Sequence, residues 1–205
     1  SDHGDLAFTR SSTGGHSSDT HGFCSNGSAT SPSLTNNIDK YSFSSESNAV
    51  DHGDLVLARY GGEGCSSTTD GYVGGGHIGA SRTNAIDKFA FSSNTTAASH
   101  GTLTVGAAAG MGQSSTTHGY AIGGYIIPSS PDVRSAHIDK FSFSSTANAA
   151  SIGSISHITN TGGHWSNTTH GHYYGGRHTS FYTNIERFSY ASDAVESSVG
   201  TLSSG

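Results

Sequence analysis

The stretch "NAIDKFAFSS", from Asn84 to Ser93, has three close copies in the same chain. They read "NNIDKYSFSS" from Asn36, "AHIDKFSFSS" from Ala136 and "TNIERFSYAS" from Thr183. Side chains alternate along an extended strand, so Phe89 and Phe91 should face one side of a sheet while Ile86 faces the other. A strand written four times predicts four copies of one building block.

Two further motifs keep the same period. A "G-x-L"-like motif stands at His3, His52, His100, Ile152 and Val199, and a "T-x-G-aromatic"-like motif stands at Thr20, Thr69, Thr117 and Thr169. The "I-D/E-K/R" strands begin at Ile38, Ile86, Ile138 and Ile185, at spacings of 48, 52 and 47 residues. We therefore divide the single domain 1–205 into units 1–50, 51–98, 99–150 and 151–205.

Composition favours an all-β chain. Only 32% of residues are hydrophobic and 12% charged, yet the chain has nine Tyr and nine Phe, which a disordered chain would lack. No apolar stripe with a 3.6-residue period persists, so we expect essentially no helix and three to four antiparallel strands per unit. The chain begins at Ser1 without Met, and we expect a processed or truncated product.

Charge and hydropathy limit the kinds of partner that the chain is expected to have. The net charge of −6, with nine scattered Lys and Arg, argues against a nucleic-acid partner, because phosphates require basic patches. No apolar run approaches the roughly 18 residues of a membrane helix, so we expect no membrane insertion.

The recurring aromatic residues predict how the units are held together. Units of this length with three or four strands are typical of a β-propeller, in which each blade packs against the next. The expected blade cores are the aromatic pairs of the repeated strand, Tyr41, Phe43, Phe89, Phe91, Phe141, Phe143, Phe188 and Tyr190.

The chain combines a glycine pair, an "I-D-K-F" strand and a "G-x-L-x-x-A-R" strand. This combination resembles the Kelch repeat over the whole chain. The family's Arg is present at Arg10 and Arg59, but its Trp after the second strand is missing from every unit. The resemblance implies a propeller scaffold without fixing a ligand. Four-bladed propellers of similar length occur in the hemopexin-like family, and a longer array is the alternative.

The Ser/Thr/Gly/Asn-rich repeats also resemble viral and phage appendage proteins and bacterial surface fibres. This resemblance implies an extracellular or virion location, with self-association or other appendage proteins as partners. We expect a non-catalytic structural protein, since the chain has no "G-x-S-x-G" and no "G-x-x-x-x-G-K" motif. The repeated acids Asp39, Asp87, Asp139 and Glu186 should bind neighbouring strands or units.

The alternative function is binding of a cell-surface glycan. The segment from His164 to Gly176 carries the aromatic and imidazole side chains suited to it, Trp165, His170, His172, Tyr173 and Tyr174.

A metal ion is the only cofactor that the sequence suggests, and hydrogen bonding is the alternative role for the same residues. His21, Asp70, His118 and His170 share one motif position and would form a ring in a symmetric propeller, with zinc-compatible ligand types. Cys24 and Cys65 either pair or remain free thiols.

One terminal strand is in excess. Five "G-x-L"-like segments accompany four of every other strand. If the N-terminal strand completes the last blade, "GDLAFTR" lies beside "NIERFSY" and "GTLSSG" is redundant. An unpaired strand is a template for association with a neighbouring subunit.

Overall fold

The structure is a computed structural model that describes residues 3–29, 33–126, 133–157, 161–177 and 180–203. These residues form an all-β fold without any helix. A helix able to cross a membrane is accordingly absent from the described part of the chain.

Four antiparallel sheets of four strands each make up most of the chain, and we call them units 1 to 4. Unit 1 contains β1 (Gly14–Ser17), β2 (His21–Ser25), β3 (Asn37–Ser42) and β4 (Val50–Asp54). Unit 2 contains β5 (Glu63–Ser66), β6 (Asp70–Gly74), β9 (Ala85–Ala90) and β10 (Ala98–Thr102). Unit 3 contains β12 (Met111–Ser114), β13 (His118–Ile122), β16 (His137–Ser142) and β17 (Ala150–Ser154). Unit 4 contains β18 (Gly163–Ser166), β19 (His170–Tyr174), β20 (Asn184–Ser189) and β21 (Val195–Thr201).

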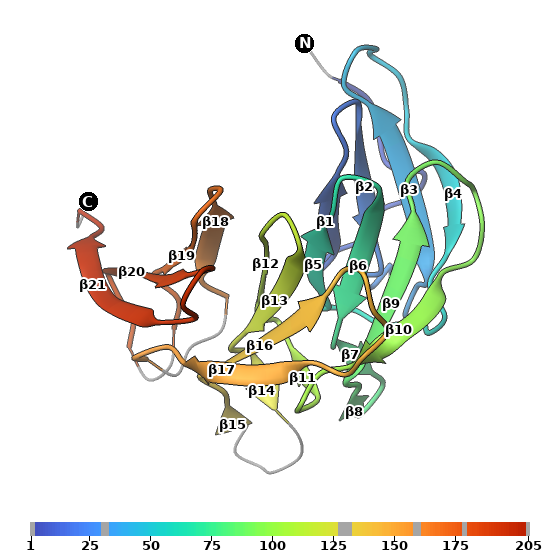
Figure 1. The fold of residues 1–205 in the computed structure, drawn as a ribbon. Coiled ribbons are helices and arrows are strands. Elements are labelled where there is room, and N and C mark those ends of the chain that lie inside the picture. Colours follow the sequence, from blue (N-terminus) through green and yellow to red (C-terminus); the bar gives the residue numbers. More distant parts are fainter. Residues whose placement is uncertain (1–2, 30–32, 127–132, 158–160, 178–179, 204–205) are drawn as a thin grey trace.

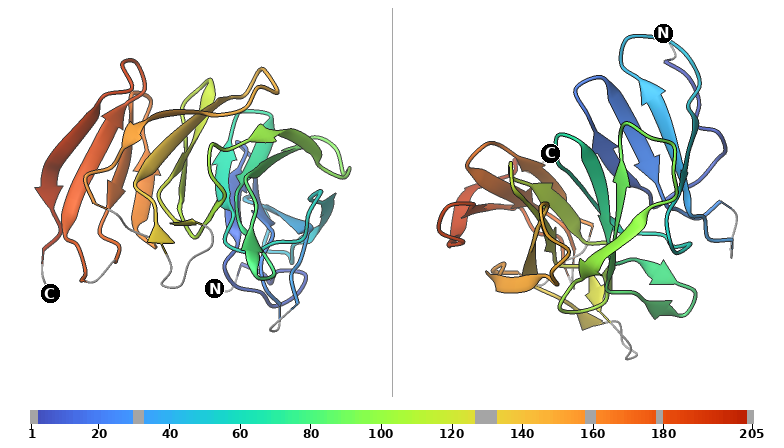
Figure 2. Two further views of the ribbon diagram at one scale, coloured as in Figure 1. Left: turned by 90° about the horizontal axis from the view of Figure 1, so that it is seen from below. Right: turned by 45° about the vertical axis from the view of Figure 1, so that its right-hand side comes forward.

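The four units stand side by side in an open row, with unit 1 at one end and unit 4 at the other (Figures 1 and 2). The first strands β1, β5, β12 and β18 contact one another in that order. Two small sheets accompany units 2 and 3: β7 (His77–Ile78) pairs with β8 (Ser81–Arg82), and β14 (Tyr125–Ile126) pairs with β11 (Ala107–Ala108) and β15 (Val133–Arg134). The described residues form no closed barrel or ring.

The glycine of the "T-x-G-aromatic" motif has a packing role. Gly71 pairs across the sheet with Phe89, whose ring lies over the glycine where a Cβ would stand. Gly22, Gly119 and Gly171 are covered in the same way by the rings of their cross-strand partners, Tyr41, Phe141 and Phe188. The glycine thus repeats because, in each unit, a cross-strand aromatic ring occupies the space that any larger side chain would need.

Aromatic rings join consecutive units, and we call each contact a junction. At the first junction Phe23 of unit 1 stacks on Phe91 of unit 2, with ring centroids 4.5 Å apart. Tyr72 stacks on Phe143 at 4.6 Å in the second junction, and Tyr120 on Tyr190 at 5.0 Å in the third. The predicted packing of one unit's aromatic pair against its neighbour is therefore confirmed at these junctions.

The predicted strand faces are confirmed as well. Phe89 belongs to the cluster between units 1 and 2, whereas Ile86 belongs to the cluster between units 2 and 3. The expected core is wrong at its first pair, because Tyr41 is only half-buried and Phe43 is exposed. No other unit of the described structure packs against that side of unit 1.

Two expectations about strand order need correction. The division after residues 50, 98 and 150 falls just inside β4, β10 and β17, which are the last strands of units 1 to 3. Likewise, "NIERFSY" pairs with β21 of its own unit, not with the N-terminal segment. The segment in excess is thus residues 3–10, which form no strand and lie against unit 1 instead.

Candidate functional site

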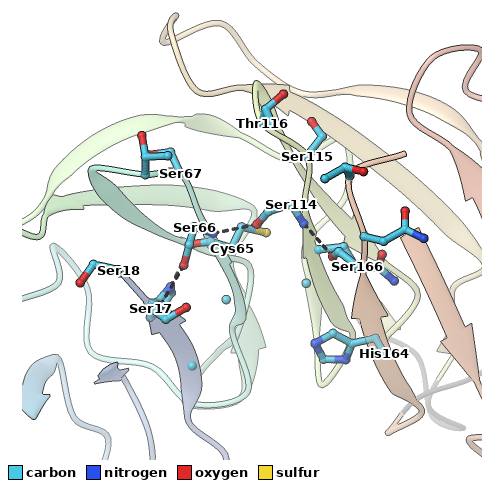
Figure 3. Close-up of a pocket in the computed structure, with 18 of the residues that line it drawn as sticks. Ser17, Ser18, Cys65, Ser66, Ser67, Ser114, Ser115, Thr116, His164 and Ser166 are labelled. Atoms are coloured by element: carbon cyan, nitrogen blue, oxygen red, sulfur yellow. Dashed lines mark hydrogen bonds between the residues drawn. The ribbon is translucent and has the colours of Figure 1, made fainter. Parts of the chain in front are cut away.

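The first strands of all four units border one cavity of about 710 Å³ (Figure 3). Its walls are mostly small and hydroxylated, and they include Ser17, Ser18, Ser66, Ser67, Thr68, Ser114, Ser115, Thr116, Ser166 and Thr168. The sequence interpretation missed these strands because four residues such as "GGHS" or "EGCS" carry no alternating apolar pattern. The repeated serine four positions before His21, Asp70, His118 and His170 was the available signal.

A ladder of serines runs along this cavity from unit to unit (Figure 3). The backbone N–H of Ser17 donates to Ser66 Oγ (3.2 Å), and that of Ser66 donates to Ser114 Oγ (2.8 Å). The N–H of Ser114 then donates to Ser166 Oγ at 3.4 Å. These hydroxyls satisfy backbone donors at the junctions, which is a structural use of serine.

The predicted metal-ligand position begins the second strand of each unit and belongs to a tight turn. In unit 1, Ser18 Oγ accepts the N–H of His21 (3.0 Å), and the Thr20 hydroxyl contacts His21 Nδ1 (2.8 Å). His118 and His170 make the same contact with Thr117 and Thr169, and Thr69 donates to Asp70. Short-range bonds of this kind stabilise turns.

The ring of His21, Asp70, His118 and His170 is not formed as a metal centre. Within the described residues, no three His, Cys, Asp or Glu side chains are placed to hold a metal ion. The physical reason is that each side chain is directed to its own turn or its own sheet. Cys24 and Cys65 are free thiols, so the pairing alternative is not realised.

A serine–histidine pair lies beneath the cavity. His16 Nε2 is 2.8 Å from Ser25 Oγ, and His16 Nδ1 is 3.0 Å from the carbonyl oxygen of Cys65. Ser25 is completely buried, so no substrate can reach its hydroxyl. Burial also lowers the pKa of His16 from 6.5 to about 4. The pair links unit 1 to unit 2 and offers no accessible nucleophile.

The repeated acids Asp87, Asp139 and Glu186 bind the preceding unit, as expected, through the segment that follows its last strand. Asp87 accepts the backbone N–H of Val56 (3.0 Å) and forms a buried ion pair with Arg59 (2.6 Å). Asp139 accepts the N–H and the hydroxyl of Thr104. These carboxylates are therefore used at the junctions.

Glu186, the fourth repeated acid, is contacted by three residues. It accepts hydrogen bonds from Ser156 and from the hydroxyl of Tyr173 (2.6 Å), and His157 Nδ1 lies 2.9 Å away. Burial alone would raise the pKa of Glu186, but the hydrogen bonds from Ser156 and Tyr173 outweigh it and the pKa is lowered. Burial and the bond to Glu186 raise the pKa of Tyr173.

The five candidate binding residues divide between the two faces of unit 4. The Trp165 ring lies 4.1 Å from the His172 ring and 6.3 Å from that of Tyr174, while His170 is 6.2 Å from His172. Tyr173 points to the opposite face, where it is buried against Glu186, because neighbours on a strand alternate. Trp165, His170, His172 and Tyr174 thus form the outer face of unit 4, and Tyr173 is not part of it.

No protein-family model matches this chain, and no curated protein matches it either.

Proposed function

We propose that the protein is a non-catalytic structural repeat protein of an extracellular or virion appendage. Its four units are interpreted as Kelch-like propeller blades of an incomplete ring or array. The observation that carries this proposal is the recurrence of one junction three times. An aromatic ring, a serine ladder and an acid–strand contact recur between units 1 and 2, 2 and 3, and 3 and 4.

The use of the polar side chains supports a structural role over catalysis. Repeated acids, serines and histidines satisfy backbone groups of a neighbouring strand or unit, and so stabilise the row of sheets. The buried pair of Ser25 and His16 is inaccessible to a substrate. Self-association or contact with other appendage proteins is the corresponding mode of action.

Glycan binding is the second candidate, and one feature favours it. Trp165 is exposed and lies beside His172 and Tyr174 on the outer face of unit 4, and a flat ring beside polar groups is the usual composition of a site for a polar ligand.

Electron microscopy of the purified protein, combined with binding to immobilised glycans, separates the two. The structural role predicts ordered multi-copy assemblies and no saturable glycan binding. Single particles of one chain that bind a glycan, with affinity lost in Trp165→Ala, would favour the second candidate instead.

A further inference from the structure

The outer face of unit 1 repeats the receiving side of a junction. Tyr41 and Phe43 form an edge-to-face pair with centroids 6.0 Å apart, as Phe89 and Phe91 (5.8 Å) and Phe141 and Phe143 (6.0 Å) do. The later pairs each receive an aromatic ring from the preceding unit. The first pair has no preceding unit in the described chain.

The segment of residues 3–10 holds the position that a preceding unit's last strand would occupy. His3 Nε2 lies 2.9 Å from the carbonyl oxygen of Ser42, just as His52 Nε2 lies 2.9 Å from that of Ala90. Asp39 accepts the N–H of Ala7 and pairs with Arg10 (2.8 Å). The equivalent contacts of Asp87 are with Val56 and Arg59, both in the segment that follows β4.

A slot is left between this segment and unit 1. It is a cavity of about 410 Å³ bordered by His3, Leu6, Cys24, Tyr41 and Ala49. The equivalent residues of the second junction, His100, Leu103, Ala121, Phe141 and Ala149, surround the ring of Tyr72. Leu6 is 36% exposed where Leu103 is 3% exposed, and Phe43 is 48% exposed where Phe143 is 9% exposed. The slot therefore has the shape of a junction without its ring.

The outer face of unit 4 carries the other half of a junction, the half that supplies a ring to the slot. His172 has the register position of Phe23, Tyr72 and Tyr120, and so presents a ring where a junction needs one. Trp165 has the position of Cys65 and Gln113, whose side chains donate to the backbone oxygens of Tyr120 and His172 in the next unit. The Trp165 indole N–H is a donor of the same kind, and the side chain is 41% exposed.

We propose that the slot of unit 1 receives the His172–Trp165 face of a second copy of this chain, in a head-to-tail contact. This inference rests on the proposed structural function and names its partner. Three junctions within the chain supply the geometry, and the two faces lie at opposite ends of the row (Figure 1). A contact between different faces continues from copy to copy until a ring closes or a filament grows.

The contact requires one strand to be exchanged. Residues 3–10 of one copy and β21 of the other would occupy the same place. β21 is the one that yields, since none of its described side chains is buried. The N-terminal segment is anchored by the buried Arg10–Asp39 pair and then adds to β20 of its neighbour as an edge strand.

Complementation between two variants tests this contact. Phe43→Asp disables the slot and Trp165→Asp disables the inserted face, each at an exposed position. Ile78→Asp is the matched control, because Ile78 is equally apolar and exposed but lies on β7, away from both faces. Leu6→Trp, which fills the slot from within, is the second slot variant should Phe43→Asp fail to fold. Masses are measured by sedimentation velocity up to about 1 mM, where even a millimolar Kd leaves many chains associated.

We expect wild type and Ile78→Asp to associate, and Phe43→Asp and Trp165→Asp to be monomers when alone. Their equimolar mixture should form a dimer and stop there, since only one intact slot and one intact face remain. Deletion of residues 195–205 should tighten association by removing the competing strand. Association that ignores both variants would overturn the head-to-tail contact and leave the structural function standing. A wild-type protein that stays monomeric at every concentration would overturn both the head-to-tail contact and the proposed structural function.

Discussion

The ring of Phe23, in unit 1, stacks on the ring of Phe91, in unit 2, at a centroid distance of 4.5 Å and an interplanar angle of 16°. His52 of the last strand of unit 1 lies 5.0 Å from the same Phe23 ring and contacts the Ala90 carbonyl oxygen of unit 2. One junction thus combines ring packing with a polar contact across the same two units. The polar chain can fold because its few large rings are concentrated at these positions.

Phe89 should be much more important for stability than Phe43, an aromatic residue of the equivalent strand in unit 1. Phe89 is buried between Phe23 and His16, so Phe89→Ala should lower the free energy of unfolding by about 3–5 kcal/mol. Phe43→Ala removes an exposed ring, at the repeat position of the buried Phe91, and should cost less than about 1 kcal/mol in the monomer. Urea unfolding of both variants makes the comparison, and equal losses would show that unit 1 is covered as unit 2 is.

His16 should make the protein sensitive to mild acid. Its pKa is lowered from 6.5 to about 4 by burial, so the unfolded chain binds a proton in this range while the folded chain does not. Stability therefore falls as the pH falls from about 6.5 to 4, by roughly 3 kcal/mol at about 1.4 kcal/mol per pH unit.

His16→Gln should remove this loss while keeping the junction. Gln113 occupies the same register position in unit 3 and donates to the next unit, so glutamine fits this place in the repeat. Unfolding free energies at pH 7 and pH 4.5 give the test. An unchanged acid sensitivity in His16→Gln would assign the effect to other groups.

Glu63 should have the opposite effect to His16 on the pH dependence of stability. Its buried side chain has a pKa raised well above 4.5, so the unfolded chain loses a proton at a lower pH than the folded chain does. Stability is then greatest below about pH 4.5 and falls as the pH rises above it. Glu63→Gln keeps the shape and stays neutral. Its unfolding free energy relative to wild type should rise between pH 5 and 8, and a constant difference would contradict the assignment.

The buried pair of Arg59 and Asp87 should tolerate joint replacement better than a single one. Both side chains are almost completely buried, and Arg59→Leu leaves the carboxylate of Asp87 without its cation, at a cost of about 3–5 kcal/mol. Adding Asp87→Asn, which retains an acceptor for the N–H of Val56, should recover part of that loss. Thermal unfolding of the three variants is the measurement. A double variant less stable than Arg59→Leu would mean that the carboxylate is not penalised by losing Arg59.

Much of each unit could be predicted from the sequence, since the repeated "I-D-K-F" strand alternates strongly and recurs at nearly constant spacing. The first strand of each unit could not, because "GGHS" and its equivalents owe their place to contacts between units. The unit boundary was displaced for a similar reason. The "G-x-L" strand pairs with the strand before it, but its side chains also contact the unit after it, and the sequence shows only that the two are neighbours.

The candidate site, too, depends on contacts in space that the sequence does not show. A shared motif position made His21, Asp70, His118 and His170 equivalent, but equivalence along the chain does not bring side chains together. Each bonds within its own turn, which depends on Ser18, Ser67, Ser115 or Asn167 three residues earlier. Tyr173 was grouped with Trp165 by proximity in sequence, although strand alternation alone places it on the other face from His172.

The most direct test of the proposed structural role is the mass of the full-length protein in solution, measured by light scattering over a concentration series. The two unmatched end faces predict a mass that increases with concentration in steps of one chain, 20.9 kDa. A mass that stays at one chain at every concentration, up to about 1 mM, would contradict the account.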